Sequence, residues 1–198
     1  MGRRSDHTRE ELFEMAMQEA RLIVAEEGWR KLTARALAKR MGYSVGTLYN
    51  LFGNIDDLVL HLNASTLDSL HHEMKQVVLR GTPIDDMEAL LDCYLCFLKA
   101  NASLWAVLFE HSLPEGQDLP DWYMEKIAVV LGYVEQAISP LFSGGEEGKR
   151  KEAAATIWAS LHGIGSLAGA NKLDAVINSS FEEMSKAFIR TYIAGLKS

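Results

Sequence analysis

The sequence predicts an all-α protein. Apolar residues recur three and four positions apart in one segment after another, which is the spacing of one face of an α-helix. Serine, threonine or asparagine stands where several of these segments begin, and glycine or proline where they end, as is typical of helix termini. The sequence has no alternating strand pattern and no Asn-Gly hairpin signal.

The first predicted helix runs from Thr8 to Gly28. Thr8 and Glu11 have the spacing of a capping box, in which each side chain accepts from a free backbone N–H of the first turn. Glycine is a common terminator because it tolerates positive φ. The apolar stripe of this helix consists of Leu12, Met15, Ala16, Ala20, Ile23 and Val24.

Two short helices and a tight turn are predicted within residues 33–52. Thr33 caps the first helix, Gly42 ends it, and Ser44 caps the second. Leu48 and Phe52 share the inward face of the second helix because they are four residues apart. Other positions then fall largely on its other faces: Val45, Gly46, Thr47, Tyr49 and Asn50. This pattern is typical of a helix-turn-helix whose second helix enters a DNA groove.

The charge distribution favours the same interpretation. Residues 1–52 carry a net charge of +2 and the remainder −9, in a chain whose net charge is −7. Between Trp29 and Phe52 there is no acidic residue, and the basic residues are Arg30, Lys31, Arg35, Lys39 and Arg40. A segment with basic and no acidic residues, in a protein that is acidic as a whole, indicates a surface that binds phosphate. Runs of basic residues are, however, also common on solvated helix faces.

The rest of the chain reads as further helices. Asn54 caps a long helix predicted over residues 55–79, which would span about 37 Å. Three more are predicted at residues 84–99, 103–109 and 121–138; Gly81 and Pro83 precede the first of them, and a loop from Pro114 to Pro120 precedes the third. Two final helices follow, the second after a Ser180/Glu183 capping box. Their stripes contain Ile157, Leu161, Ile164 and Ala168 on one helix, and Phe181, Met184, Phe188 and Tyr192 on the other.

An ordered series of residues in the first third of the chain matches a known pattern. The series is Glu26-Glu27-Gly28-Trp29, Leu32-Thr33, Ala36-Leu37-Ala38, Met41-Gly42, Ser44 to Tyr49, Phe52 and Asp57-Leu58. With it, the chain resembles the tetracycline-repressor (TetR-like) family of bacterial transcription regulators. Trp158 and His162-Gly163 are similar to a Trp/His-Gly signature of one branch of that family.

This resemblance implies the organisation of the whole chain. A three-helix DNA-binding head, residues 1–54, would be joined by the long helix to a helical body, residues 55–198, that binds an effector and dimerises. Carried over by position, Thr33 would cap its helix next to a phosphate, and Tyr49 would reach a phosphate through its hydroxyl. Ser44, Val45, Gly46 and Thr47 would open the recognition helix, and Asn50 would lie near a base edge.

Two positions depart from the family pattern. Leu51 stands where many members have a histidine, and Ile55 where many have a lysine. Their side chains cannot make the backbone phosphate contacts of those residues, so Arg35 or Lys39 would have to compensate. The sequence therefore leaves open a second hypothesis, in which the chain is a helical module that binds small molecules or proteins and no longer uses DNA.

The first hypothesis is a homodimeric, ligand-responsive repressor that a small apolar or amphipathic effector releases from a palindromic operator. The final two helices would pair with their two-fold mates into a four-helix bundle, burying the stripes described above. The resemblance to this family implies an effector pocket in the body, although most of the large side chains of the body would be core residues. Candidate lining residues are Met74, Trp105, Phe109, His111, Trp122, Trp158 and His162.

Other chemistry has little support in the sequence. Cys93 and Cys96 share a helix face, and core packing explains them better than a redox or zinc site. A helical redox protein that uses these two cysteines stays open as a third hypothesis. His162, one turn from Trp158, is expected to be a core histidine rather than a ligand or switch residue. No catalytic set, cofactor site or metal site is identifiable, so an enzyme is not expected. With no apolar leader or membrane-length segment, we expect a cytoplasmic protein.

Overall fold

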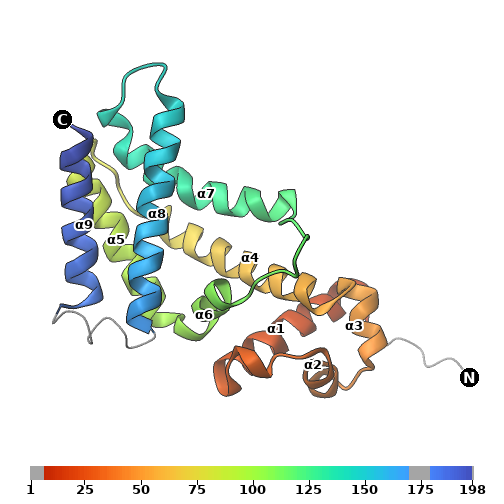
Figure 1. The fold of residues 1–198 in the computed structure, drawn as a ribbon. Coiled ribbons are helices and arrows are strands. Elements are labelled where there is room, and N and C mark those ends of the chain that lie inside the picture. Colours follow the sequence, from red (N-terminus) through yellow and green to blue (C-terminus); the bar gives the residue numbers. More distant parts are fainter. Residues whose placement is uncertain (1–6, 170–178, 198) are drawn as a thin grey trace, which may run out of the picture. The chain divides into compact units, whose positions relative to one another are not determined.

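The computed structural model describes residues 7–169 and 179–197 of the chain (Figure 1). Helices make up all the regular structure of these residues, and no strand occurs among them, so the predicted all-α fold is confirmed. The elements are α1 (Arg9–Glu27), η1 (Trp29–Lys31), α2 (Ala34–Met41), α3 (Val45–Phe52), α4 (Ile55–Met74), α5 (Pro83–Ala100), α6 (Ala102–Glu110), α7 (Asp121–Ile138), η2 (Ser139–Leu141), α8 (Glu147–Gly169) and α9 (Phe181–Leu196).

The chain forms two compact units. Unit 1 comprises residues 1–66 and 101–123, and unit 2 comprises residues 67–100 and 124–198. Unit 1 thus extends beyond the three-helix head expected at residues 1–54 and includes α6. The reason is burial, because Val107 of α6 is fully buried in the same hydrophobic cluster as Ile23, Leu37 and Leu48.

The ends of the head helices are set by the residues that the sequence singled out. The capping box of Thr8 and Glu11 is present at the start of α1. Thr33 Oγ1 accepts the backbone N–H of Ala36 at 3.1 Å, and Ser44 Oγ accepts that of Thr47 at 3.2 Å. Between α2 and α3, Gly42 adopts the left-handed conformation with φ 74° and ψ 22°, which glycine enters without steric cost. The predicted helix-turn-helix is therefore confirmed.

The core of unit 1 holds α2 and α3 against α1. Leu37 of α2 and Leu48 and Phe52 of α3 are almost completely buried, together with Ala16 and Ile23 of α1. Burying a large apolar side chain stabilises a fold by about 1.5–3 kcal/mol. Since these side chains occupy one face of each short helix, the opposite face of α3 is left toward solvent.

The long helix α4 is shorter than predicted. It ends at Met74 rather than near residue 79, so its 20 residues span about 30 Å. Its last turn tightens, because the N–H groups of Gln76 and Val77 bond three residues back, both at 3.0 Å. Beyond it, the buried carboxylate of Asp86 accepts the backbone N–H groups of Arg80 and Gly81, each at 2.8 Å, and holds the chain in a non-helical path.

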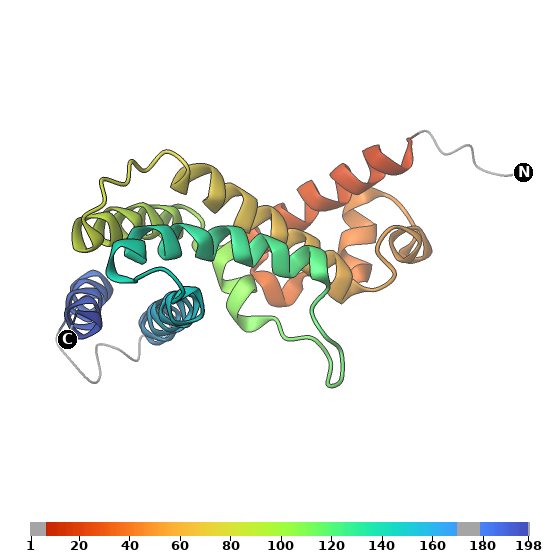
Figure 2. The ribbon, with the colours of Figure 1, turned by 90° about the horizontal axis from the view of Figure 1, so that it is seen from above.

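Unit 2 is built around α5, α8 and α9. Helix α9 packs against both α5 and α8, and Figure 2 shows α8 and α9 side by side. Ile157 of α8 and Ile189 and Ile193 of α9 are completely buried within the chain. Ion pairs at the edge of this contact join α9 to α5, from Arg190 to Glu88 at 2.6 Å and from Lys186 to Asp92 at 3.0 Å.

Among the described helices, no single one is both long and apolar enough to cross a bilayer. Only the pair α5 and α6, taken together as a bent segment, meets the length and composition requirement. Phe97 of α5 and Trp105 and Val107 of α6 are buried, which is also typical of core helices.

Candidate nucleic-acid interface

The outward face of α3 is polar and accessible. Ser44, Gly46 and Asn50 are exposed, and Tyr49 keeps 48% of its surface in contact with solvent. Thr47 is half-buried and its hydroxyl hydrogen-bonds that of Ser44 at 3.0 Å. This face therefore presents hydroxyl and amide groups, which can bind phosphates and base edges.

Not every predicted DNA-contacting residue has the same environment. Val45 is half-buried and packs against the core of the head, so its side chain also supports the position of α3. Gly46 is different, because a Cβ added there would meet only Ser44 Oγ at 3.6 Å, an ordinary contact. The packing of the fold therefore does not require glycine at position 46.

The five basic residues of the head divide into two groups. Arg40 is 2.9 Å from Glu19, 2.8 Å from Glu26 and 3.4 Å from Glu27, and hydrogen bonds with Glu26 and Glu19 raise its pKa. Arg30 lies 3.6 Å from Glu110. These two guanidinium groups are matched by carboxylates of the chain itself, so they add little to the positive field of the surface.

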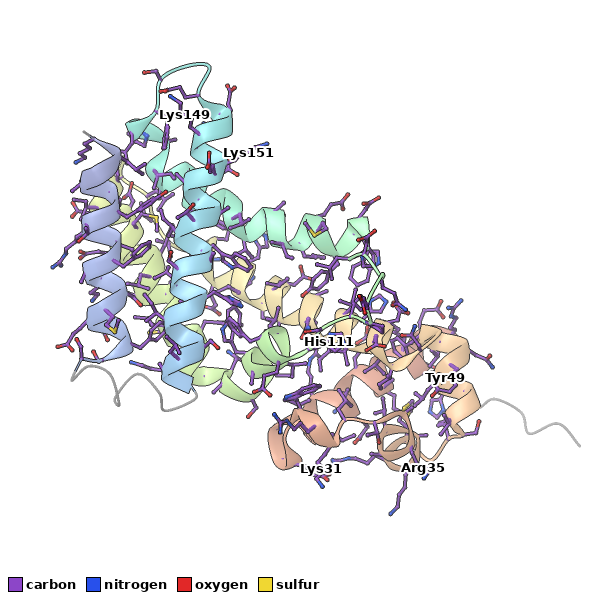
Figure 3. The ribbon with its side chains drawn as sticks, in the orientation of Figure 1. Lys31, Arg35, Tyr49, His111, Lys149 and Lys151 are labelled. Carbon is purple, nitrogen blue, oxygen red and sulfur yellow. The ribbon has the colours of Figure 1, made fainter. Side chains whose placement is uncertain are left out.

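The other three basic residues remain available for phosphate. Lys31, Arg35 and Lys39 are exposed, and no ion pair to them is formed within the described part of the chain. Figure 3 shows the Lys31 and Arg35 side chains directed outward from the head, and it labels Tyr49 on α3. Of the five basic residues in this segment of the sequence, only these three therefore contribute a positive charge that no carboxylate of the described chain offsets.

The structure explains the two departures from the family pattern. Leu51 and Ile55 are half-buried and pack against the hydrophobic core of the head. A cation that sequence analysis missed lies beside this position, since Arg9 Nη2 donates to the backbone carbonyl of Leu51 at 3.4 Å. Arg9 comes from the first turn of α1, so only the fold, and no local motif, brings it to the end of α3.

The candidate effector residues fall into both units. Trp105, Phe109, His111 and Trp122 belong to unit 1, whereas Met74, Trp158 and His162 belong to unit 2. In unit 1, the Trp105 and Phe109 rings meet edge to face at 5.5 Å, and Trp122 stacks on His61 at 4.7 Å. His111 Nε2 lies 2.9 Å from the Asp56 carboxylate, and its side chain is 8% exposed. Their part in effector binding stays a prediction.

Trp158 and His162 are neighbours on α8. Their ring centroids are 4.8 Å apart, and Trp158 is 39% exposed. Burial lowers the pKa of His162 to about 4, so its imidazole is neutral at neutral pH. An exposed tryptophan beside an uncharged histidine gives this part of unit 2 an apolar, aromatic surface.

The predicted dimer residues lie on α8 and α9. Ile157 is completely buried within the chain, so its side chain packs inside unit 2. The remaining seven residues are half-buried: Leu161, Ile164, Ala168, Phe181, Met184, Phe188 and Tyr192. The Phe188 and Tyr192 rings stack at 5.5 Å, leaving part of both accessible. Whether these side chains meet a second copy stays a prediction.

The core packing expected of both cysteines holds in part for Cys93 and is wrong for Cys96, because the side chain of Cys96 faces solvent. Cys93 is half-buried and Cys96 is exposed on α5, and both are free thiols. Burial raises the pKa of the Cys93 thiol, which disfavours the reactive thiolate form. Among the described residues, no group of three or more His, Cys, Asp or Glu side chains has the arrangement of a metal site.

Comparisons with known families match both parts of the chain. A family model described as "Tetracyclin repressor-like, C-terminal domain" matches residues 87–191, more than half of the sequence. A second, described as "Bacterial regulatory proteins, tetR family", matches residues 17–62, which include the helix-turn-helix. The matched domains thus cover the DNA-facing head and the helical body.

Individual relatives are distant in sequence but similar in fold. The chain is 24% identical over 152 residues to Rv0681 of Mycobacterium tuberculosis, an uncharacterised helix-turn-helix-type transcriptional regulator, covering 76% of this chain and 67% of that protein. A Rhodococcus sp. RHA1 protein of unknown function superposes over the full length of both chains with a TM-score of 0.70 at 20% identity. The TetR-family regulator PfmR of Thermus thermophilus gives a TM-score of 0.56 at 16% identity, covering 93% and 99% of the two chains.

These matches agree with the outward, polar recognition helix and the free cations beside it. The likeness of Trp158 and His162 to a branch signature stays a prediction. The chain belongs to the tetracycline-repressor family, and it is a DNA-binding transcriptional regulator.

Proposed function

We propose that this regulator is a homodimeric repressor that releases a pseudo-palindromic operator when it binds a small apolar or amphipathic effector. The observation that carries the proposal is the accessible face of α3, where Tyr49 and Asn50 are exposed opposite the buried Leu48 and Phe52. Each protomer would insert one α3 into the major groove. The two half-sites would then lie about 34–36 Å apart, or a multiple of that distance.

The proposed DNA contacts are of two kinds. Hydroxyl groups of Thr33, Ser44, Thr47 and Tyr49, with the cations Lys31, Arg35 and Lys39, would bind phosphates and fix the register. Gly46 would let the backbone approach the duplex, and Asn50 would lie near base edges. Arg9 is added to this set because its guanidinium lies at the Leu51 carbonyl, where the usual histidine is absent.

Ligand response requires that the body alter the head. Helix α6 supports such a coupling, because it packs within unit 1 against α1 and η1 and buries Val107 there. Only Asn101 separates α6 from the end of α5. An effector that favours a conformation with displaced heads would weaken DNA binding by its differential affinity, typically about 1–3 kcal/mol.

Footprinting on the DNA upstream of the gene for this chain, combined with sedimentation analysis, tests the proposal. We expect protection of two half-sites related by two-fold symmetry, and one dimer bound per site. Saturable binding of a monomer to one unrepeated site would contradict it. Both family models that match the chain describe regulators, and no reaction is proposed for this protein.

The alternative hypothesis, a helical binding module that has abandoned DNA, makes an opposite prediction. Its support is that Leu51 and Ile55 are apolar where many family members have a histidine and a lysine. Affinity for genomic fragments, measured at two salt concentrations, separates the two hypotheses. Repressor function requires affinity that falls steeply with salt and differs between fragments, whereas the alternative requires weak binding that is the same for all.

A further inference from the structure

A buried polar atom on α4 has no hydrogen-bond partner. Asn63 is 2% exposed, and its side-chain oxygen Oδ1 is fully buried and unsatisfied. The neighbouring polar side chains do not serve it, because the hydroxyls of Ser65 and Thr66 donate to the Leu62 carbonyl at 2.7 and 3.1 Å. Most buried polar atoms in folded proteins are satisfied, so an orphaned acceptor in a helix core calls for an explanation.

The other end of the same amide is engaged. The side chain of Asn63 hydrogen-bonds the phenolic oxygen of Tyr123, a residue of α7 that is 5% exposed. Because Asn63 Oδ1 is without a partner, the amide NH₂ is the donor in this bond and the phenolic oxygen the acceptor. Burial raises the pKa of Tyr123 to about 12, so the hydroxyl keeps its proton at neutral pH.

The pair therefore presents one acceptor and one donor from two helices of the same unit. Asn63 Oδ1 accepts, and the Tyr123 O–H can donate. Aromatic rings adjoin the phenol, since Trp122 lies edge to face with Tyr123 at 5.8 Å and stacks on His61. Aromatic side chains with a few convergent polar groups have the composition of a small-molecule site.

We propose that Asn63 and Tyr123 are the polar recognition point of the effector, and that the effector is an uncharged molecule with an apolar body and a hydroxyl or N–H donor. This inference rests on the proposed ligand-responsive function. A hydroxyl matches both groups, because it donates to Asn63 Oδ1 and accepts from Tyr123. A carboxylate has no proton to donate and would place its charge against the amide oxygen.

The test uses three probes that share one ring system: 1-naphthol, 1-methoxynaphthalene and 1-naphthoate. Binding to the full-length protein is followed by calorimetry. We expect 1-naphthol to bind at least about ten-fold more tightly than the ether, because the ether cannot satisfy the buried acceptor. The naphthoate should bind more weakly than 1-naphthol. Equal affinity of the hydroxyl and ether probes, tighter binding of the naphthoate, or no binding of any probe would overturn the inference.

Two variants locate the effect. Asn63→Leu removes the orphaned acceptor, so 1-naphthol and its ether should bind with equal affinity. Tyr123→Phe removes only the hydroxyl, retains the ring, and should weaken 1-naphthol several-fold, which keeps the proposal testable if Asn63→Leu does not fold. Thr66→Val is the matched control, because it removes a buried hydroxyl that already has a partner. Retained discrimination in Asn63→Leu would overturn the assignment.

The same proteins separate this inference from the proposed function. Operator binding without probe should be equal in the wild type and in Thr66→Val, since Thr66 lies outside both the DNA-facing residues and the recognition point. A wild type that distinguishes the probes but binds no specific DNA would sink the repressor proposal and leave the recognition point standing. A wild type that binds its operator but does not distinguish the probes would overturn the recognition point and leave the repressor proposal standing.

Discussion

The indole Nε1 of Trp29 donates a 2.7 Å hydrogen bond to the carboxylate of Glu110, which lies 81 positions later in the chain. Trp29 opens η1 in the head, and Glu110 is the last residue of α6. One residue further, His111 lies 2.9 Å from Asp56 in the first turn of α4. The C-terminal end of α6 is thus attached at two separate points, to η1 in the head and to the start of α4, both within unit 1.

The Trp29–Glu110 bond should stabilise unit 1 measurably. Trp29→Phe keeps the ring and removes the N–H, and Glu110→Gln keeps the shape and removes the charge. In a double-mutant cycle of urea unfolding, we expect a coupling of about 1 kcal/mol, because hydrogen bonds to charged groups are stronger than neutral ones but this one is partly exposed. Additive effects of the two substitutions would show that the bond contributes nothing.

Arg35 and Arg40, five positions apart, should behave differently in DNA binding. Arg35→Ala should weaken operator binding several-fold and reduce the slope of log K against log salt by about one, as expected for one lost phosphate contact. Arg40→Ala should leave that slope unchanged and lower the thermal midpoint, because Glu19, Glu26 and Glu27 lose their shared cation. Filter binding at four salt concentrations distinguishes them, and equal slopes for the two variants would contradict the division.

Gly46→Ala should separate stability from DNA binding. The added methyl meets only Ser44 Oγ at 3.6 Å, and alanine is favoured over glycine in a helix, so the free energy of unfolding should rise by about 0.5–1 kcal/mol. Operator affinity should fall, because the methyl would stand between the helix and the duplex. Gel-shift titration and urea unfolding of the same preparation measure both quantities. A variant that is more stable and binds equally well would remove Gly46 from the interface.

His162 should make stability depend on pH. Its folded pKa of about 4 lies below the usual 6.5, so the neutral imidazole is the form that folds. The contribution of the neutral His162 imidazole to the free energy of unfolding is fully present above pH 6.5 and is lost as the pH falls toward 4. Since the side chain is only about half-buried, solvent screening reduces the difference between wild type and His162→Gln to about 1 kcal/mol. Parallel unfolding curves of the two proteins from pH 7 to 4.5 would contradict this.

Phe188→Glu should convert the proposed dimer into monomers. Phe188 is half-buried and stacks on Tyr192, so a carboxylate there would be desolvated in a two-fold bundle of α8 and α9. Sedimentation velocity measures the mass, and circular dichroism checks that the helices remain. Ala187→Glu, one position away, is the matched substitution on another face of α9. A folded Phe188→Glu dimer would mean that another surface forms the interface.

Local chemistry explains what the sequence made predictable. Thr8, Thr33, Ser44 and Ser180 all cap the helices that they were expected to cap, because a capping side chain acts within three residues of itself. Helices α5, α6 and α7 begin and end within one residue of their predicted bounds. The face of α3 that meets solvent also followed from the spacing of Leu48 and Phe52 alone.

The features that escaped prediction depend on residues far apart in the chain. The carboxylates around Arg40 come from α1, and Arg9 reaches Leu51 across 42 positions. Burial of Val107 in the head could not be read from α6, whose apolar face fits a core in either unit. Asn63 also gave no signal, because an orphaned acceptor is defined only by the partners that the fold fails to supply.

The path of the chain has a consequence for building hybrid regulators. It passes between the two units three times, once inside α4, once at Asn101 and once inside α7. Two of these crossings are uninterrupted helix, and the third is a single residue. A head cut away after residue 54 would leave behind Val107 and Glu110, on which its own packing depends. Exchanging DNA specificity between relatives therefore means transplanting α6 along with the first three helices, or rewriting the recognition face in place.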